Sequence, residues 1–238
     1  MRNRLLLILA IASLPSTLSA DLSVMVDGRS RPEYNHRGTT YLDAIRGREY
    51  ALRITNPTGH RVAVALAVDG LNTIDAKHSD GWNAAKWVLE PYESTVISGW
   101  QVSGSTARTF FFTGERNSYG AALGETENLG VIEAIFYRER GRPIVQFHER
   151  RDEQSRGQEA PSAAPKAAAD DDFAATGMGG RTRHDVERVN IDLDPNPIEH
   201  VRIRYEFRPQ LVKLGVLSGR SPLERREKAK GFEYCPEP

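Results

Sequence analysis

The sequence predicts an all-β protein, an antiparallel β-sandwich of the jelly-roll or immunoglobulin-like type. Many short segments alternate apolar and polar residues, Gly, Pro and Asn turns separate them, and no segment sustains a 3.6-residue period. With 238 residues the chain is long enough for one or two domains with a real core. Its 32 basic and 32 acidic side chains cancel, which argues against a nucleic-acid partner.

Residues 1–20 have the order of a secretory signal peptide. Arg2 and Arg4 precede an apolar run over residues 5–12, and small residues then lead to Ala20. The run is shorter than the roughly 20 residues that a membrane-spanning helix needs. The alternative is a buried N-terminal helix. We therefore expect a periplasmic or extracellular protein without a transmembrane segment.

The β-sandwich body is expected over residues 21–147, and its first strand, residues 22–26, ends in Asp27-Gly28. Apolar positions recur with period two over residues 50–54 and again over residues 62–68, around the turn at residues 56–59. These two runs predict an antiparallel hairpin. Because alanines fill the second face of the later run, another layer can approach it closely. That run ends in Asp69-Gly70, which repeats the turn chemistry of Asp27-Gly28.

Further short strands complete the expected body. Residues 95–102 predict a strand with Val96, Ser98, Trp100 and Val102 on one face. The segments 106–113 and 131–137 are apolar on both faces, which places them centrally in a sheet. The remaining strands, in order, are expected at residues 86–89, 106–113, 131–137 and 144–147.

The rest of the chain divides into three parts. Residues 148–183 are rich in Ala, Pro and Asp and predict a flexible, disordered linker inserted before the end of the fold. Residues 184–217 alternate cleanly around Asp194-Pro195-Asn196-Pro197 and predict a C-terminal β-hairpin that packs on the body. Residues 218–238 predict a frayed tail.

Several motifs occur in order along the chain, at residues 50–58, 67–72, 87–94, 98–101, 128–132, 175–179 and 204–205. Together they resemble a group of exported bacterial hypothetical proteins. The resemblance implies export and one shared layout, and it assigns no activity, cofactor or catalytic residue.

No catalytic motif is recognised, so we expect neither an enzyme nor a cofactor. The six histidines form no His-x-x-x-His pair, and the serine-hydrolase, P-loop and dinucleotide-binding patterns are absent from the sequence. The oxygen-rich loop from Asp69 to Asp80 is interpreted as turn chemistry, with a cation site as the alternative. The single cysteine, Cys235, is either an incidental thiol or the source of an intermolecular disulfide.

Four aromatic residues are the candidate ligand-binding residues: Trp82, Trp87, Tyr92 and Trp100. On an exposed face their rings would stack against sugars, whereas in a sandwich they would fill the core. The leading hypothesis is a non-enzymatic structural or interaction module of the cell envelope, with an envelope protein or a glycan as partner. A glycan-binding module is the second hypothesis, and an enzyme of unknown class is the third.

Overall fold

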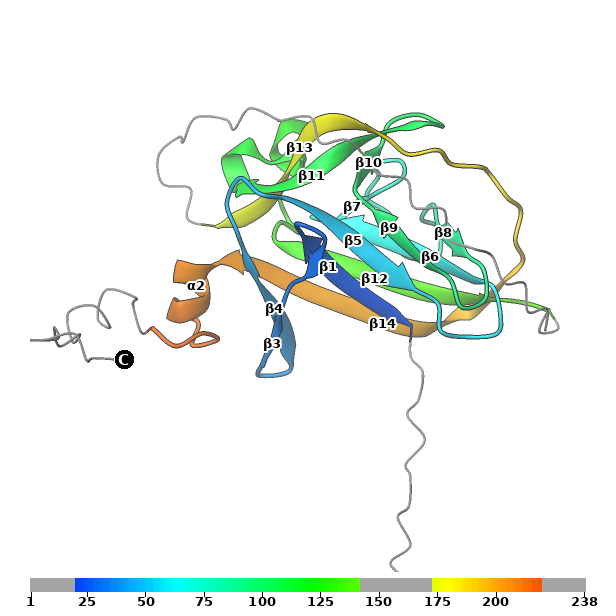
Figure 1. Ribbon diagram of the computed structural model, residues 1–238, viewed down its shortest axis with the longest axis horizontal. Helices are drawn as coiled ribbons and strands as arrows, with labels where there is room; N and C mark the ends of the chain where they lie inside the picture. Colours follow the sequence, from blue (N-terminus) through cyan, green and yellow to red (C-terminus); the bar gives the residue numbers. More distant parts are fainter. Residues whose placement is uncertain (1–19, 142–172, 220–238) are drawn as a thin grey trace, which may run out of the picture.

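The computed structural model describes residues 20–141 and 173–219, in which two seven-stranded β-sheets pack face to face (Figure 1). The fold is the predicted all-β sandwich. The first sheet has the strand order β10-β11-β5-β1-β2, with β13 beside β11 and β9 beside β5. Its strands are β1 (Asp21–Val26), β2 (Arg29–Ser30), β5 (Glu49–Thr55), β9 (Ser94–Ile97), β10 (Gly99–Gln101), β11 (Thr106–Gly114) and β13 (Ala174–Arg183).

The second sheet has the order β3-β4-β14-β12-β6-β7, with β8 also beside β6. Strand β14 runs parallel to β4 and antiparallel to β12, so this sheet is mixed. Its strands are β3 (Glu33–His36), β4 (Thr39–Ala44), β6 (Val62–Val68), β7 (Leu71–Asn72), β8 (Trp87–Leu89), β12 (Val131–Glu139) and β14 (Leu193–Phe207).

Helical structure is confined to short segments at the ends of strands. A 3₁₀ turn, η1 (Glu115–Asn117), leads into α1 (Tyr119–Leu123), and α2 (Arg208–Lys213) follows β14. The Ser118 side chain caps α1 by accepting a hydrogen bond from the Ala121 N–H. Among the described residues no helix is long and apolar enough to cross a membrane.

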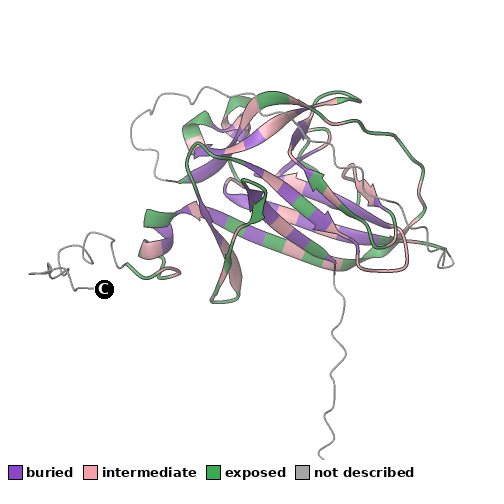
Figure 2. Ribbon diagram, viewed as in Figure 1, coloured by how far each residue is buried: buried purple, intermediate pink, exposed green. Residues whose placement is uncertain are grey.

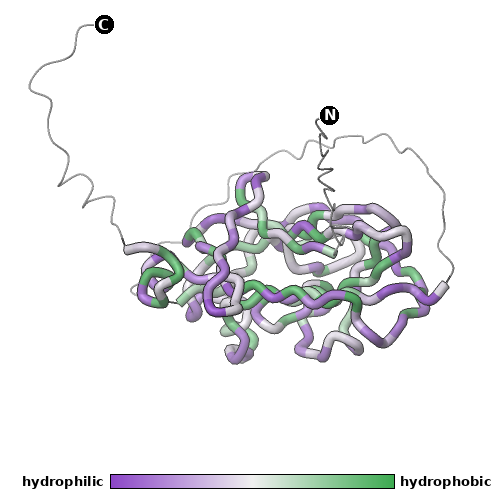
Figure 3. Tube along the Cα trace, turned by 90° about the horizontal axis from the view of Figure 1, so that it is seen from below, coloured by the Kyte–Doolittle hydropathy of each residue, from purple (hydrophilic) through white to green (hydrophobic). Residues whose placement is uncertain are grey.

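One hydrophobic core fills the space between the sheets. Strand β5 shows the period-two pattern that builds it, with Tyr50, Leu52 and Ile54 buried between more exposed neighbours. Figure 2 shows the same alternation as bands along β14, and Figure 3 shows hydrophobic and hydrophilic positions interchanging along the strands. Because each sheet contributes one apolar face, neither is stable without the other.

The repeated Asp-Gly turn is confirmed. Asp27-Gly28 and Asp69-Gly70 both have positive φ at both residues, and each closes a two-residue hairpin. This geometry favours Asn, Asp and Gly, because other side chains pay a steric cost there.

The hairpin expected over residues 50–68 is wrong. Strand β5 pairs with β1 and β9 in the first sheet, whereas β6 pairs with β12 and β8 in the second. The turn between the two strands therefore carries the chain from one sheet to the other. The buried Asn56 side chain holds this turn by donating hydrogen bonds to the carbonyl oxygens of His60 and Glu90. The apolar faces of β5 and β6 contribute to the same hydrophobic core from opposite sheets.

The single strand expected over residues 95–102 is also wrong, because two strands form there and the expected face is not buried as a whole. It breaks at Ser98 into β9 and β10, and the buried residues on either side are Ile97 and Trp100. Val96 and Val102 are exposed. The break lets β9 pair with β5 while β10 pairs with β11.

The C-terminal third differs most from expectation. Residues 174–183, expected within the linker, form β13, which pairs along β11. Residues 184–192, expected as the first hairpin strand, form an extended segment outside any sheet, which we call the strap. Strand β14 continues through Pro195 and Pro197 with register shifts, and it has no β4 partner before Ile203. Proline is tolerated there because it occupies an edge with a bulge.

Several predictions lie outside the described residues. They are the signal peptide up to residue 19, the strand at 144–147, the linker between 148 and 172, and the tail from residue 220, which includes Cys235.

Candidate functional site

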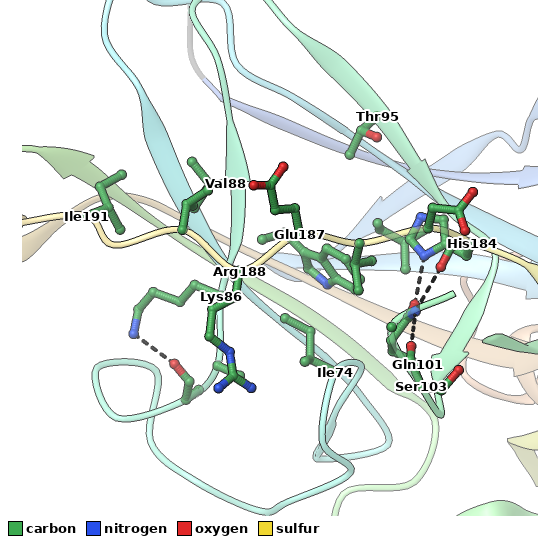
Figure 4. A pocket seen from close by; sticks show the side chains of 18 of the residues that line it. Ile74, Lys86, Val88, Thr95, Gln101, Ser103, His184, Glu187, Arg188 and Ile191 are labelled. Atoms are coloured by element: carbon green, nitrogen blue, oxygen red, sulfur yellow. Dashed lines mark hydrogen bonds between the residues drawn. The ribbon is translucent and has the colours of Figure 1, made fainter. Parts of the chain in front are cut away.

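A groove with a volume of ≈ 870 Å³ lies where the edges of the two sheets meet. The strap crosses it, and Figure 4 shows side chains that line it. Strand β8 and the preceding residues 84–86 form one wall, and β9 with residues 101–104 forms the other. Strap residues 184–189 and Ile191, together with Arg61, Ile74 and Glu90, complete the lining. The volume lies at the upper end of small-molecule sites, which run from about 300 to 1,000 Å³.

The strap is fixed at both ends. At the first end the N–H groups of His184 and Val186 donate to the carbonyl oxygens of Ser105 and Gly104. At the second end the Arg140 N–H donates to the Asp192 carbonyl at 2.8 Å. Residues 187–191, between these anchors, make no backbone hydrogen bond within the described part of the chain. The strap is therefore a bridge whose middle is free of the sheets, and Figure 2 shows it mostly exposed.

Gln101 and His184 form a paired contact at the first anchor (Figure 4). The Gln101 Nε2 donates to the carbonyl oxygens of Ser103 at 2.6 Å and His184 at 2.9 Å. Its Oε1, 2.7 Å from His184 Nδ1, is then the acceptor, so Nδ1 carries the imidazole proton. Burial lowers the pKa of His184, against an opposing effect of Asp185. The imidazole is neutral at pH 7, and its Nε2 keeps an unprotonated lone pair.

Trp87 supplies the aromatic part of the lining. It is half-buried, packs against the core, and donates its Nε1–H to Thr73 Oγ1 at 2.9 Å. Its ring lies edge-on to the His184 ring, with 5.4 Å between centroids. This places a rigid indole next to the Gln101–His184 pair.

The charges of the lining cancel. Arg61, Lys86 and Arg188 oppose Glu90, Asp185 and Glu187. Arg61 forms ion pairs with Glu90 at 3.0 Å and with Glu139 at 3.2 Å. The groove therefore has no charge excess that would favour an ionic ligand.

The loop before β8 holds the ammonium group of Lys86. Its Nζ donates to the carbonyl oxygens of Trp82 and Ala84, and it lies 5.5 Å from the Trp82 ring and 5.2 Å from the Tyr137 ring. Burial lowers the pKa of Lys86, against the attraction of Asp80. Gly81 of this loop fits closely against Ile135 and Tyr137 of β12, which pair with Ala65 and Ala63 of β6.

The four candidate aromatic residues do not form one surface. Trp100 is 2% exposed in the core, Trp87 lines the groove, and Trp82 is 44% exposed on the outer face of the second sheet. Tyr92 is 71% exposed in the turn after β8. Only Trp87 combines a ring with neighbouring polar groups in a cavity.

A second polar cluster is buried between the sheets. The Asp69 carboxylate accepts hydrogen bonds from the Tyr205 hydroxyl at 2.5 Å, the Gly130 N–H at 2.9 Å and the Thr176 N–H at 2.7 Å. The Thr176 hydroxyl lies 2.6 Å from the Tyr205 hydroxyl and 2.7 Å from that of Tyr50. Residues of β13 and β14 thus meet at the Asp69 carboxylate, and Tyr50 of β5 joins the cluster through Thr176, so the network links the two sheets.

The environment of this cluster shifts its ionisation. Burial raises the pKa of Asp69 to about 6, although the hydrogen bonds from Tyr205 and from the backbone oppose the shift. Burial also raises the pKa values of Tyr50 and Tyr205 well above their usual range, helped by the negative Asp69. Because Asp69 is buried and its three accepted hydrogen bonds join the two sheets, we assign this cluster to stability.

The oxygen-rich loop uses its side chains in turns. Asp75 Oδ1 accepts from the Lys77 N–H, and Asp80 Oδ1 accepts from the N–H groups of Trp82 and Asn83. No group of three or more His, Cys, Asp or Glu residues in the described ranges is arranged to hold a metal ion.

Comparison with protein-family models, with curated proteins and with solved structures gave no match to this chain. The site therefore stands on its own geometry. Sequence reasoning singled out Trp87 but missed Gln101 and the strap. Gln101 and His184 are 83 residues apart, and no local pattern links them.

Proposed function

We propose that this protein is an exported, non-enzymatic interaction module of the cell envelope, and that the groove beneath the strap is its binding element. The observation that carries the proposal is the convergence of apolar and polar side chains from several separate segments in one cavity. Such a mixture is typical of binding sites, where apolar area gives affinity and a few fixed polar groups give orientation.

Export is supported by the position of the first strand. The order of residues 1–20 is that of a cleavable signal, and β1 begins at Asp21. Cleavage near Ala20 therefore leaves every described strand intact. Intact-mass measurement on periplasmic or secreted protein should show that about the first 20 residues are missing. Retention of Met1 would contradict export.

The binding role is tested by placing a large charged side chain at the mouth of the groove. Val102 lines the groove and is 51% exposed, so Val102→Arg disturbs little of the core. Val96 is 43% exposed, next to groove-lining Thr95 and Ile97 but absent from the lining, and Val96→Arg is the matched control.

The tagged mature protein is cross-linked in its own envelope and then purified. We expect one partner to be retained by the unaltered protein and by Val96→Arg, and to be lost with Val102→Arg. A partner that is retained equally by all three proteins would place binding elsewhere.

A further inference from the structure

We propose that the groove binds a neutral oligosaccharide, with Trp87 as the aromatic contact and the Gln101–His184 pair as a polar contact. The assignment rests on the proposed function, since it names the chemistry of the ligand for the same groove. Four features of the lining lead to it.

The first feature is the charge balance. Three basic and three acidic side chains line the groove, and the imidazole of His184 is neutral. Arg61 is bound by Glu90 and Glu139, and Asp185 lies 2.8 Å from Arg183. Because the basic and acidic side chains are equal in number, a phosphate, carboxylate or ammonium group on a ligand would find no excess of opposite charge. The lining is complementary to a ligand that is polar but uncharged.

The second feature is the indole of Trp87. A sugar ring presents C–H groups on its faces and hydroxyl groups around its edge, and an aromatic ring contacts the apolar face without removing water from the hydroxyls. Tryptophan combines a large apolar area with few rotatable bonds, so little entropy is lost on binding. The Nε1–H bond to Thr73 fixes the plane of the indole in advance.

The third feature is a set of polar atoms with hydrogen-bonding capacity that faces the same space. His184 Nε2 is an acceptor, since its Nδ1 proton is committed to Gln101. Thr95 adds a hydroxyl from β9, and Figure 4 shows its side chain in the lining together with those of His184 and Gln101. Neutral donors and acceptors at fixed positions are suited to hydroxyl groups.

The fourth feature is the shape of the site. The strap is held at two ends and crosses the groove without backbone hydrogen bonds from residues 187–191 to the described residues. Strap residues 184–189 and Ile191 line the groove as well, so the ligand space is an open channel between the strap and the sheet edges rather than a closed pocket. A linear chain of sugar units fits such a channel better than a compact small molecule does.

The experiment titrates the mature full chain with defined probes by isothermal calorimetry. The neutral probes are the β-1,4-linked hexasaccharides of glucose and of N-acetylglucosamine. A galacturonic acid hexasaccharide is the acidic probe, and an uncharged hexapeptide represents an extended protein segment. We expect at least one neutral sugar to bind, and the acidic sugar and the peptide to bind at least tenfold more weakly.

Two tryptophan variants locate the site. Trp87→Leu should weaken neutral-sugar binding at least tenfold, whereas Trp82→Leu, on the outer face of the second sheet, should leave it within twofold. Trp87→Phe keeps an aromatic ring and should retain more affinity than Trp87→Leu, which separates loss of the ring from loss of folding. Thermal unfolding of each variant verifies that it is folded.

Each outcome has a distinct meaning. If no neutral sugar binds at millimolar concentration while Val102→Arg still loses its envelope partner, the ligand class is wrong and the proposed function stands. Tighter binding of the peptide would replace the sugar with a protein segment as the occupant. If sugar binding is lost with Trp82→Leu instead of Trp87→Leu, or survives Val102→Arg, the groove is not the sugar site.

Discussion

At the scale of single residues, two copies of one turn show how position decides chemistry. Asp27 and Asp69 each precede a glycine and adopt nearly the same left-handed backbone, with φ of 51° and 53°. Asp27 is exposed and lies 2.6 Å from Arg48, a contact of the kind that contributes little to stability. Asp69 is buried and accepts three hydrogen bonds that link the sheets. The same dipeptide is therefore a surface turn in one place and a structural centre in the other.

The buried Asp69 should make the protein more stable as the solution becomes mildly acidic. Its pKa is about 6 in the folded protein and 3.8 in a free side chain, so between these values the folded state binds a proton that the unfolded chain does not. The contribution of Asp69 protonation to the free energy of unfolding appears as the pH falls through 6, and it is complete below pH 3.8. Two pKa units correspond to about 3 kcal/mol.

Urea unfolding of the unaltered protein and of Asp69→Asn should be measured from pH 7.5 to pH 4. The stability advantage of the unaltered protein should grow by about 2–3 kcal/mol over this range as the pH falls. Asp27→Asn, in the exposed copy of the turn, is the control and should differ by a constant amount within about 0.5 kcal/mol. An advantage that shrinks towards low pH would show that the carboxylate is held in its ionised form.

At the scale of elements, β14 is the strand on which the second sheet is built. It lies between β12 and β4, and Ile203, Tyr205 and Phe207 are buried in the core. On its other face Arg202 is exposed opposite Glu133. Alternate side chains of this strand therefore face the core and the solvent.

Substitutions on the two faces of β14 should differ greatly in cost. Ile203→Ala removes a fully buried side chain and should lower the free energy of unfolding by about 2–5 kcal/mol, because transfer energy is lost and a cavity remains. Arg202→Ala should change it by no more than about 0.5 kcal/mol. Chemical denaturation compares the two variants, and equal small effects would mean that the strand is loosely attached.

The strap is attached through hydrogen bonds near its two ends. Gln101→Ala removes the side chain that holds His184, while the backbone bonds of His184 and Val186 remain. We expect faster proteolysis within residues 185–191 and little change in global stability, because local opening needs less free energy than unfolding. Ser94→Ala, which removes an exposed hydroxyl on β9, is the control and should leave the cleavage rate unchanged. Unchanged cleavage in Gln101→Ala would show that the backbone anchors suffice.

At the scale of the whole molecule, the two described parts of the chain form one sandwich. Residues 173–219 contribute β13 to the first sheet and β14 to the second, so both sheets need both parts. The Asp69 cluster adds a buried polar link between them. The C-terminal part is thus integral to the fold rather than an accessory on its surface.

Cutting the backbone between the two parts should leave the fold intact. A protease site inserted after Gly157 allows cleavage of the folded protein. The fragments should elute together on size exclusion, because their separation would expose the core and the edges of β11 and β12. Fragments that separate under native conditions would show that the C-terminal part is independent.

The sequence by itself determined the fold class, most of the strands and the shared Asp-Gly turn, because period-two patterning and turn chemistry are local properties of a chain. Only the tertiary structure decided that β5 and β6 belong to different sheets, that residues 174–183 are a strand, and that β14 runs through its prolines. Strand pairing depends on partners distant in the sequence, and the glycines in β13 carry no apolar pattern. The candidate site was predictable only at Trp87. Its polar centre joins Gln101 to His184 across 83 residues. That contact exists only because β10 and β13 both pair with β11, and the chain after β13 is held at Ser105, just before β11 begins.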